Sequence, residues 1–253
     1  MPGDSVFVKG STHLVCEDYA QHGDGFALVS DGCSSAPRSD VAARLVYLGA
    51  RRAFAEARLR PEIDAAALKE LDLRHLALAA HDEPLFATLL TARVLGSRAV
   101  VTVVGDGEVL TARQGTVERR KFHYPLCNAP YYPAYALQPP LEALWRRDFP
   151  DNPLVIEREG AEPERSMAAE PWVTLEWNVE DLEWILLTSD GLSSFVDAHG
   201  RPVEERRVID GLCAFKNRTG GFLQRRVLRL LDELRAEGIA PYDDFSAAVL
   251  TFD

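Results

Sequence analysis

Short apolar runs bounded by turn residues recur along the chain, and they predict extended strands. Several of these runs end in Asp-Gly, a dipeptide that favours tight turns. The run over residues 98–122 is interrupted by Asp-Gly and again at Gly115, which predicts a meander of antiparallel strands. We expect strands over residues 5–10, 22–32, 85–95, 98–122, 172–191 and 242–253.

Helical periodicity separates these groups of predicted strands. The clearest helix is expected from Ser39 to about residue 60, because Val41, Leu45 and Leu48 fall on one face. Ser39 is expected to cap it. Further helices are predicted over residues 65–82, 192–197, 204–215 and 220–238, the last of them ended by Gly238.

Residues 125–170 differ from the rest of the sequence. Proline and aromatic residues crowd the first part of this segment, and the second part is polar and irregular. We expect a mobile or variable insertion, which either covers a site as a lid or forms a plain surface loop. No linker interrupts the remaining pattern, so residues 1–253 are expected to form one domain of sheets packed against helices.

Composition and charge narrow the class of protein. Of the 253 residues, 47% are apolar, and the net charge of −11 disfavours binding to a nucleic-acid backbone. The apolar stretches are far shorter than the roughly 20 residues of a membrane helix, and no signal peptide is evident. The four cysteines are widely spaced and form no CxxC pair. The sequence therefore lacks the cysteine spacing that is typical of a zinc site. We expect a cytoplasmic protein that binds neither nucleic acid nor membrane.

Acidic residues gather at the predicted strand ends. Carboxylates that share a partly dry cleft repel one another, so they must share protons or hold cations. Oxygen ligands without histidine or cysteine select Mg²⁺ or Mn²⁺ over zinc. A single Asp-Gly is usually only a turn, and Asp210-Gly211 is assigned no role. The joint pattern predicts a divalent-metal site built from Glu17, Asp18, Asp31, Asp106, Asp190, Asp243 and Asp244.

The order of the motifs CEDYA, FALVSDG, VVTVVGDGEVLTARQG, ILLTSDG and DDFSAAVL resembles the metal-dependent serine/threonine protein phosphatases of type 2C, and most closely a bacterial branch of that family. The resemblance runs from about residue 5 to residue 253. It implies an α+β fold, a four-layer αββα sandwich in which helices flank two antiparallel β-sheets. Residues 125–170 would then be a flap-like insertion.

The resemblance also implies roles for individual residues. Asp31 would bridge two Mn²⁺ or Mg²⁺ ions, Asp190 and Asp243 would be further ligands, and these three would act in catalysis through a metal-activated water. Asp244 would contact the ligand Asp243 without binding the metal itself. The other implied ligands are Gly32 through its carbonyl, Glu17 and Asp18 at the second ion, directly or through water, and Asp106 at a weaker third ion.

The sequence departs from the family pattern near the implied site. Cys33 stands where the family usually has His or Met after Asp-Gly. Ser34 and Ser35 replace the two glycines that follow. His13 stands where the family commonly has a phosphate-binding arginine, and Arg38 could substitute for it. His13 and Arg38 are therefore the candidate phosphate-binding residues. Tyr131 and Tyr132 either cover a substrate or pack within their own loop.

The implied activity is hydrolysis of phosphoserine or phosphothreonine in proteins by a water that bridges two metal ions, without a covalent intermediate. A role in signalling and a monomeric state are expected. Two alternatives remain open. One is a catalytically weak or inactive regulatory module that binds phosphopeptides, and the other is a phosphatase for small phosphate esters.

Overall fold

Two antiparallel sheets form the centre of the computed structural model, which describes residues 1–159, 161–166 and 171–252. Every strand pairing in both sheets is antiparallel. The seven-stranded sheet has the order β1 (Gly3–Val8), β14 (Phe245–Thr251), β11 (Trp184–Thr188), β6 (Gly107–Arg113), β7 (Thr116–His123), β8 (Leu154–Arg158) and β9 (Glu164–Ser166). The five-stranded sheet has the order β10 (Trp172–Asn178), β5 (Arg98–Val104), β4 (Leu89–Leu95), β3 (Phe26–Ser30) and β2 (Tyr19–Gly23).

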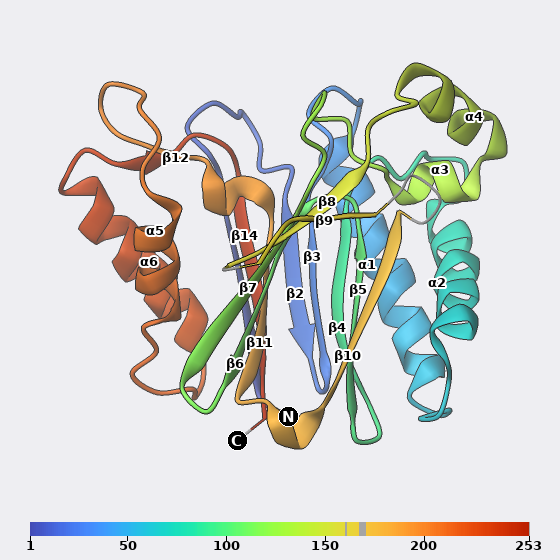
Figure 1. Cartoon of the computed structure of the whole chain (residues 1–253), viewed down its shortest axis with the longest axis horizontal. Helices are drawn as coiled ribbons and strands as arrows, with labels where there is room; N and C mark the ends of the chain where they lie inside the picture. Colours follow the sequence, from blue (N-terminus) through green and yellow to red (C-terminus); the bar gives the residue numbers. More distant parts are fainter. Residues whose placement is uncertain (160, 167–170, 253) are drawn as a thin grey trace.

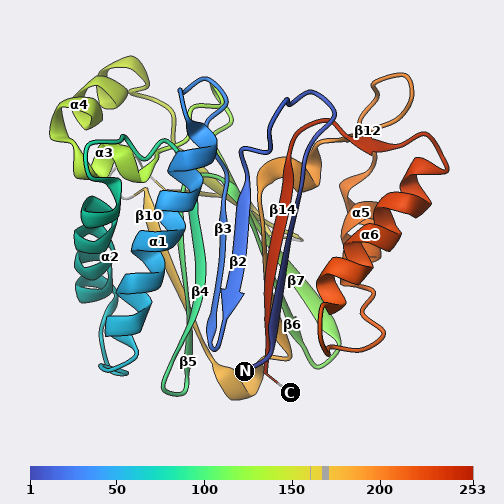
Figure 2. The same cartoon turned by 180° about the vertical axis from the view of Figure 1, so that it is seen from behind.

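Helices cover the outer face of each sheet, as Figures 1 and 2 show from opposite sides. The helices α1 (Ser39–Ala57) and α2 (Ala65–Ala80) pack outside the five-stranded sheet. On the other side lie α5 (Glu205–Cys213) and α6 (Phe222–Arg235), close to the small pair β12 (Phe195–Val196) and β13 (Ala240–Pro241). The predicted four-layer αββα sandwich is confirmed.

Alternating side chains of the central strands fill two separate cores. In β11, Ile185 and Leu187 point into the cluster that includes residues of both sheets. Trp184 and Leu186 point the other way, into the cluster under α5 and α6. Successive side chains of a strand face opposite sides, and here both faces are covered. A strand buried on both faces reads as a continuous apolar run, which explains the uninterrupted WILLT of β11.

Two local predictions are wrong. Ser39 does not cap α1; Arg38 precedes the helix in a left-handed conformation, and the Ser39 hydroxyl donates to Glu17 Oε1 at 2.6 Å instead. Residues 192–197 do not form a helix, because a 3₁₀ turn over Asp190–Ser193 leads directly into β12.

The segment 125–170 is more ordered than its composition predicted. Its described part contains α3 (Pro133–Leu137), α4 (Pro139–Asp148), β8 and β9. An aromatic cluster holds the two helices together: the rings of Tyr135 in α3 and Trp145 in α4 are 5.9 Å apart, and Tyr131 packs against both. Tyr131 and Tyr132 are buried and pack against other aromatic rings, and that they cover a substrate stays a prediction. The predicted irregular stretch falls partly on residues 160 and 167–170, which lie outside the described residues.

A buried ion pair attaches α2 to the five-stranded sheet. The Arg93 guanidinium of β4 donates to both oxygens of Asp72 at 2.7 and 2.8 Å, and neither side chain is exposed. Burial raises the pKa of Asp72, and the charge and hydrogen bonds of Arg93 oppose that shift. Removing one partner would leave the other charge buried without compensation.

We predict that Arg93→Ala lowers the free energy of unfolding by about 3–5 kcal/mol. Urea denaturation followed by circular dichroism measures this change. The control is Arg235→Ala, which removes a largely exposed arginine paired with Asp232 and should leave stability almost unchanged. A loss for Arg93→Ala no larger than that of the control would contradict the assigned structural role.

Candidate metal centre

The predicted acidic ligands converge at one edge of the sandwich. The upper edge in Figure 1 carries the loop after β3, the connection between β1 and β2, and the turn after β11. Because adjacent strands are antiparallel, loops that are distant in sequence meet there. The acids are placed as follows: Glu17 and Asp18 before β2, Asp31 after β3, Asp106 between β5 and β6, Asp190 after β11, and Asp243 and Asp244 before β14.

Mutual repulsion and burial act together on the carboxyl groups of Asp18, Asp31 and Asp106. Burial raises the pKa of Asp31 and Asp106 well above the usual range, and the charge of Asp190 raises both further. Burial raises the pKa of Asp18 to about 7, although contacts with the side chains of Ser189 and Ser246 oppose the shift. These acids therefore share one electrostatic environment, as the sequence predicted.

Asp190 has a cationic neighbour that the sequence analysis missed. Burial raises the pKa of Asp190, while its contact with Asp31 and the positive charge of Lys121 oppose the shift. The Lys121 ammonium donates to Ser193 Oγ at 3.0 Å and to Glu205 at 2.7 Å. The available signal was the alternation of Arg119 and Lys121 in β7, which places both on one face of the strand.

A cavity of about 300 Å³ opens beside these residues. Its wall includes Asp106, Asp190, Lys121, Ser193 and Asn128. Two predicted ligands and a cation therefore face one space, which is large enough for a phosphate group.

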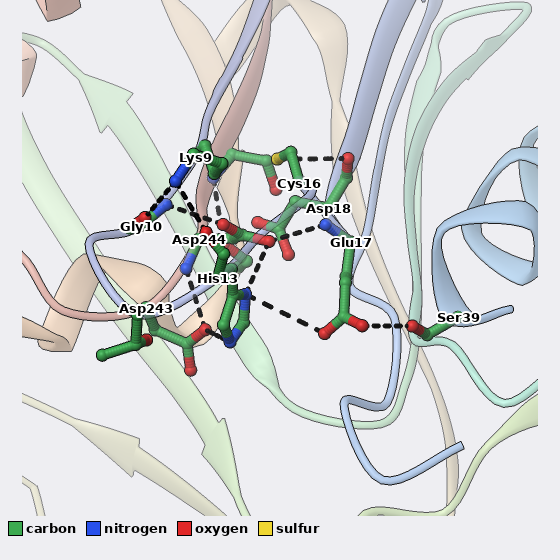
Figure 3. Close-up of polar contacts among 12 residues, drawn as sticks. Lys9, Gly10, His13, Cys16, Glu17, Asp18, Ser39, Asp243 and Asp244 are labelled. Atoms are coloured by element: carbon green, nitrogen blue, oxygen red, sulfur yellow. Dashed lines mark hydrogen bonds and ion pairs between the residues drawn. The ribbon is translucent and has the colours of Figure 1, made fainter. Parts of the chain in front are cut away.

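His13 lies among carboxylates, as Figure 3 shows. Its Nδ1 is 2.9 Å from Asp244, its Nε2 is 3.3 Å from Asp243, and Nδ1 is 3.8 Å from Glu17. Burial lowers the pKa of His13, but contact with Asp244 and the charges of all three acids outweigh that effect and raise it. The three acids thus favour the protonated form of His13.

Asp244 fastens the N-terminal loop to the C-terminal motif. Its two carboxylate oxygens accept from the backbone N–H groups of Gly10 at 2.7 Å and Glu17 at 2.6 Å. Burial tends to raise the pKa of Asp244, but His13 and these N–H groups lower it overall. The arrangement fits the predicted role of Asp244 behind Asp243.

Glycine permits two close backbone approaches at this edge. A Cβ on Gly191 would lie 1.8 Å from the carbonyl oxygen of Asp244. A Cβ on Gly32 would lie 2.6 Å from the carbonyl oxygen of Ser39. Both distances are too short for a side chain. The glycine of each Asp-Gly dipeptide therefore allows close packing around the acids as well as a turn of the chain.

The other sequence candidates contact residues other than the shared acids in the hydrogen bonds and ion pairs that the structure describes. Arg38 is mostly exposed and forms an ion pair with Glu83. Cys33 is half-buried, with Sγ 3.2 Å from Ser35 Oγ. Asp210, which was assigned no role, is exposed on α5 and pairs with Arg206.

Comparison with known proteins identifies the fold. The family described as protein phosphatase 2C matches residues 9–123. The chain superposes on the serine/threonine phosphatase PstP/Ppp of Mycobacterium tuberculosis with a TM-score of 0.57 and 19% identity, covering 98% of this chain and 96% of that one. The chain has the fold of the type 2C protein phosphatases.

Two further structures share the type 2C fold. The PPM Ser-Thr phosphatase MsPP of Mycobacterium smegmatis, solved with cacodylate, gives a TM-score of 0.56 at 16% identity over 99% of this chain and 98% of that one. The catalytic domain of PstP, solved with two manganese ions, gives a TM-score of 0.54 at 19% identity over 98% of this chain and 96% of that one. No curated protein matches the chain.

The residues present suit a hard divalent cation. The predicted side-chain donors are all carboxylates, and one oxygen each of Glu17 and Asp18 is buried without a hydrogen-bond partner among the described residues. Within the described part of the chain, no three Asp, Glu, His or Cys side chains are already arranged to hold an ion. The fit therefore depends on donor chemistry and on the two unsatisfied oxygens.

We predict that the metal-free protein loses stability as the pH rises from about 5 to about 8. Asp18, with a pKa of about 7, keeps a proton in the folded state that the unfolded state releases near pH 4. The folded state then binds more protons, so the free energy of unfolding falls as the pH rises through this interval. Urea denaturation in the presence of a chelator measures the slope.

Asp18→Asn should flatten that slope, because the substituted side chain does not titrate. Added Mn²⁺ should stabilise the unsubstituted protein more at the higher pH, where protons compete less for the carboxylates. A slope of the opposite sign in the metal-free protein would contradict the assignment of shared, buried carboxyl groups.

Proposed function

We propose that this chain is a metal-dependent phosphomonoester hydrolase that removes phosphate from phosphoserine and phosphothreonine in proteins. The observation that carries the proposal is the set of coupled, buried carboxyl groups at the loop edge of a type 2C phosphatase fold. Buried like charges destabilise a fold unless they are neutralised, so their presence favours a cation-binding function.

Each acid has a proposed task at this edge. The charges of Asp18, Asp190 and Asp106 all raise the pKa of Asp31, and we assign Asp31 as the bridging ligand, with Asp190 and Asp243 as further ligands. The remaining proposed ligands are the Gly32 carbonyl, Glu17, Asp18 and, for a weaker third ion, Asp106. Two bound Mn²⁺ or Mg²⁺ ions would lower the pKa of a water and neutralise charge on the phosphoryl group.

Lys121 is our proposed phosphate-binding residue. An ammonium group has three donors, and Ser193 and Glu205 accept two of them. The third can reach a phosphoryl oxygen in the cavity that Lys121 shares with Asp106 and Asp190. The sequence candidates His13 and Arg38 do not line that cavity, although both stay predictions for contacts elsewhere on the substrate.

The similar structures favour a protein substrate over a small ester. PstP and MsPP are serine/threonine phosphatases, and the chain shares their fold over almost its whole length. Phosphoprotein substrates, a signalling role, a cytoplasmic location, a monomeric state and a single domain over residues 1–253 stay predictions from the sequence. No described helix is long and apolar enough to span a membrane.

The inactive regulatory module remains the second candidate because of residues beside Asp31. Cys33, Ser34 and Ser35 stand where the family pattern has a different loop, and His13 occupies the arginine position. Such a module would bind metal or a phosphopeptide without turnover. The retained acids favour the enzyme.

We predict Mn²⁺-dependent hydrolysis of both p-nitrophenyl phosphate and a phosphoserine peptide. Asp31→Asn and Asp190→Asn should each lower kcat/KM at least about 100-fold, because each removes charge that holds the cations. Asp210→Asn is the matched control, since it alters an exposed Asp-Gly in α5 and should leave activity unchanged. Metal-independent activity, or full activity in Asp190→Asn, would refute the proposal; metal binding without turnover would favour the regulatory module.

We predict that Lys121→Gln raises KM for both substrates about tenfold while Mn²⁺ dependence is retained. Glu205 keeps Arg119 as a partner, so the substitution does not strand its charge. Lys121→Arg should restore part of the affinity because it returns a cationic donor. Steady-state kinetics on all three proteins provide the measurement, and an unchanged KM in Lys121→Gln would remove Lys121 from the site.

A further inference from the structure

A second, basic pocket lies between α6 and the loop that joins α5 to α6. We call it the α6 pocket. It has a volume of about 210 Å³, and its lining residues are Ala214, Phe215, Lys216, Asn217, Phe222, Arg225, Arg226 and Arg229. Three arginines and a lysine thus surround one hollow.

The positive charge of the α6 pocket is largely uncompensated. Among the described residues, no carboxylate lines the pocket. Arg225 donates to two neutral acceptors, Asn217 Oδ1 at 3.2 Å and the Thr219 carbonyl at 2.9 Å. Among the residues that the structure describes, Lys216 and Arg229 form no ion pair.

Arg226 alone among the four cations has an acidic partner, Glu233 at 2.8 Å. Its side chain is only 13% exposed, and its Nε is buried with no hydrogen-bond partner among the described residues. Like charges held together in this way repel one another and cost free energy. The chain has a net charge of −11, yet few of the acidic residues that the structure describes pair with these cations. An anionic ligand would remove that cost.

Aromatic packing makes the floor of the α6 pocket rigid. The rings of Phe215 and Phe222 meet edge to face at 5.2 Å, and Phe215 also packs against Trp184 of β11. Phe222 begins α6, so the first turn of the helix is held against the core. A fixed platform lowers the entropy lost when a ligand binds.

The α6 pocket is remote from the metal centre. Arg218 in the same loop pairs with Glu183, which immediately precedes β11, whereas Asp190 follows the opposite end of that strand. Five strand residues span roughly 17 Å. Figures 1 and 2 place the α5–α6 loop toward the edge that carries both termini, away from the acidic edge.

Size and donor geometry select the ligand class. The volume is below the range of drug-sized sites and suits a single phosphate group. Guanidinium groups bind phosphate through paired, charge-assisted hydrogen bonds, and arginine clusters are a recurrent device for reading phosphorylated protein segments. The net charge of the chain disfavours nucleic acid.

We propose that the α6 pocket binds a phosphate group carried on a protein segment, at a site separate from the metal centre. If the proposed function holds, this segment belongs to a phosphoprotein substrate, and the pocket docks it at a distance from the phosphate that is removed. Binding itself needs no catalysis, so it can be measured whether or not the chain proves to be a phosphatase.

Isothermal titration calorimetry on the full chain with chelator present tests the proposal. The probes are a phosphoserine peptide, the same peptide without phosphate, inorganic phosphate, and vesicles of phosphatidylglycerol. Without cations the acidic edge disfavours phosphate, and the variants below show whether a bound peptide occupies the α6 pocket. The double variant Arg225→Ala/Arg229→Ala removes two exposed pocket side chains, and Arg235→Ala removes an exposed arginine of the same helix outside the pocket.

We expect the phosphopeptide to bind and the unphosphorylated peptide not to bind. The double variant should weaken binding at least about tenfold, and Arg235→Ala should bind as the unsubstituted chain does. Absence of phosphopeptide binding, equal binding in the double variant, or preferential binding of inorganic phosphate or vesicles would overturn the proposal. With Mn²⁺ present, the double variant should also raise KM for a phosphoprotein but not for p-nitrophenyl phosphate.

Discussion

Repulsion among buried carboxyl groups at one edge of the sandwich is the constraint around which the structure is organised. Asp18, Asp31, Asp106 and Asp190 each carry a pKa raised by burial and by their neighbours. Isolated, such a cluster would favour opening of the loops that hold it. The two sheets, each covered by helices, provide the rigid frame that keeps these groups together.

Contacts between distant parts of the chain fix this edge in place. The carboxylate of Asp244 joins the backbone of Gly10 and Glu17 to the C-terminal motif, and the bare backbone of Gly191 lets the turn after β11 lie against Asp244. Lys121 brings a positive charge to Asp190, and His13 contacts Asp244, Asp243 and Glu17, which favour its protonated form. The arrangement partly offsets the repulsion and leaves oxygens of Glu17 and Asp18 unsatisfied, as expected of a cation-binding centre.

The sequence predicted what depends on periodicity and motif order. Apolar runs that end in Asp-Gly located β3, β5 and β11, and the family resemblance implied the four-layer sandwich. The sequence did not predict contacts between residues that are distant along the chain. The Ser39 hydroxyl donates to Glu17 instead of capping α1, and Lys121 lies beside Asp190. Nor did composition reveal that aromatic packing orders the described part of residues 125–170.

The central claim is that the acidic edge holds two divalent cations bridged by Asp31. A crystal structure of the full chain grown with Mn²⁺, with anomalous data collected at the manganese edge, tests it most directly. We predict two anomalous peaks that share the Asp31 carboxylate, with Asp190 and Asp243 among the remaining ligands. Manganese bound elsewhere, or no manganese at this edge at saturating concentration, would contradict the account.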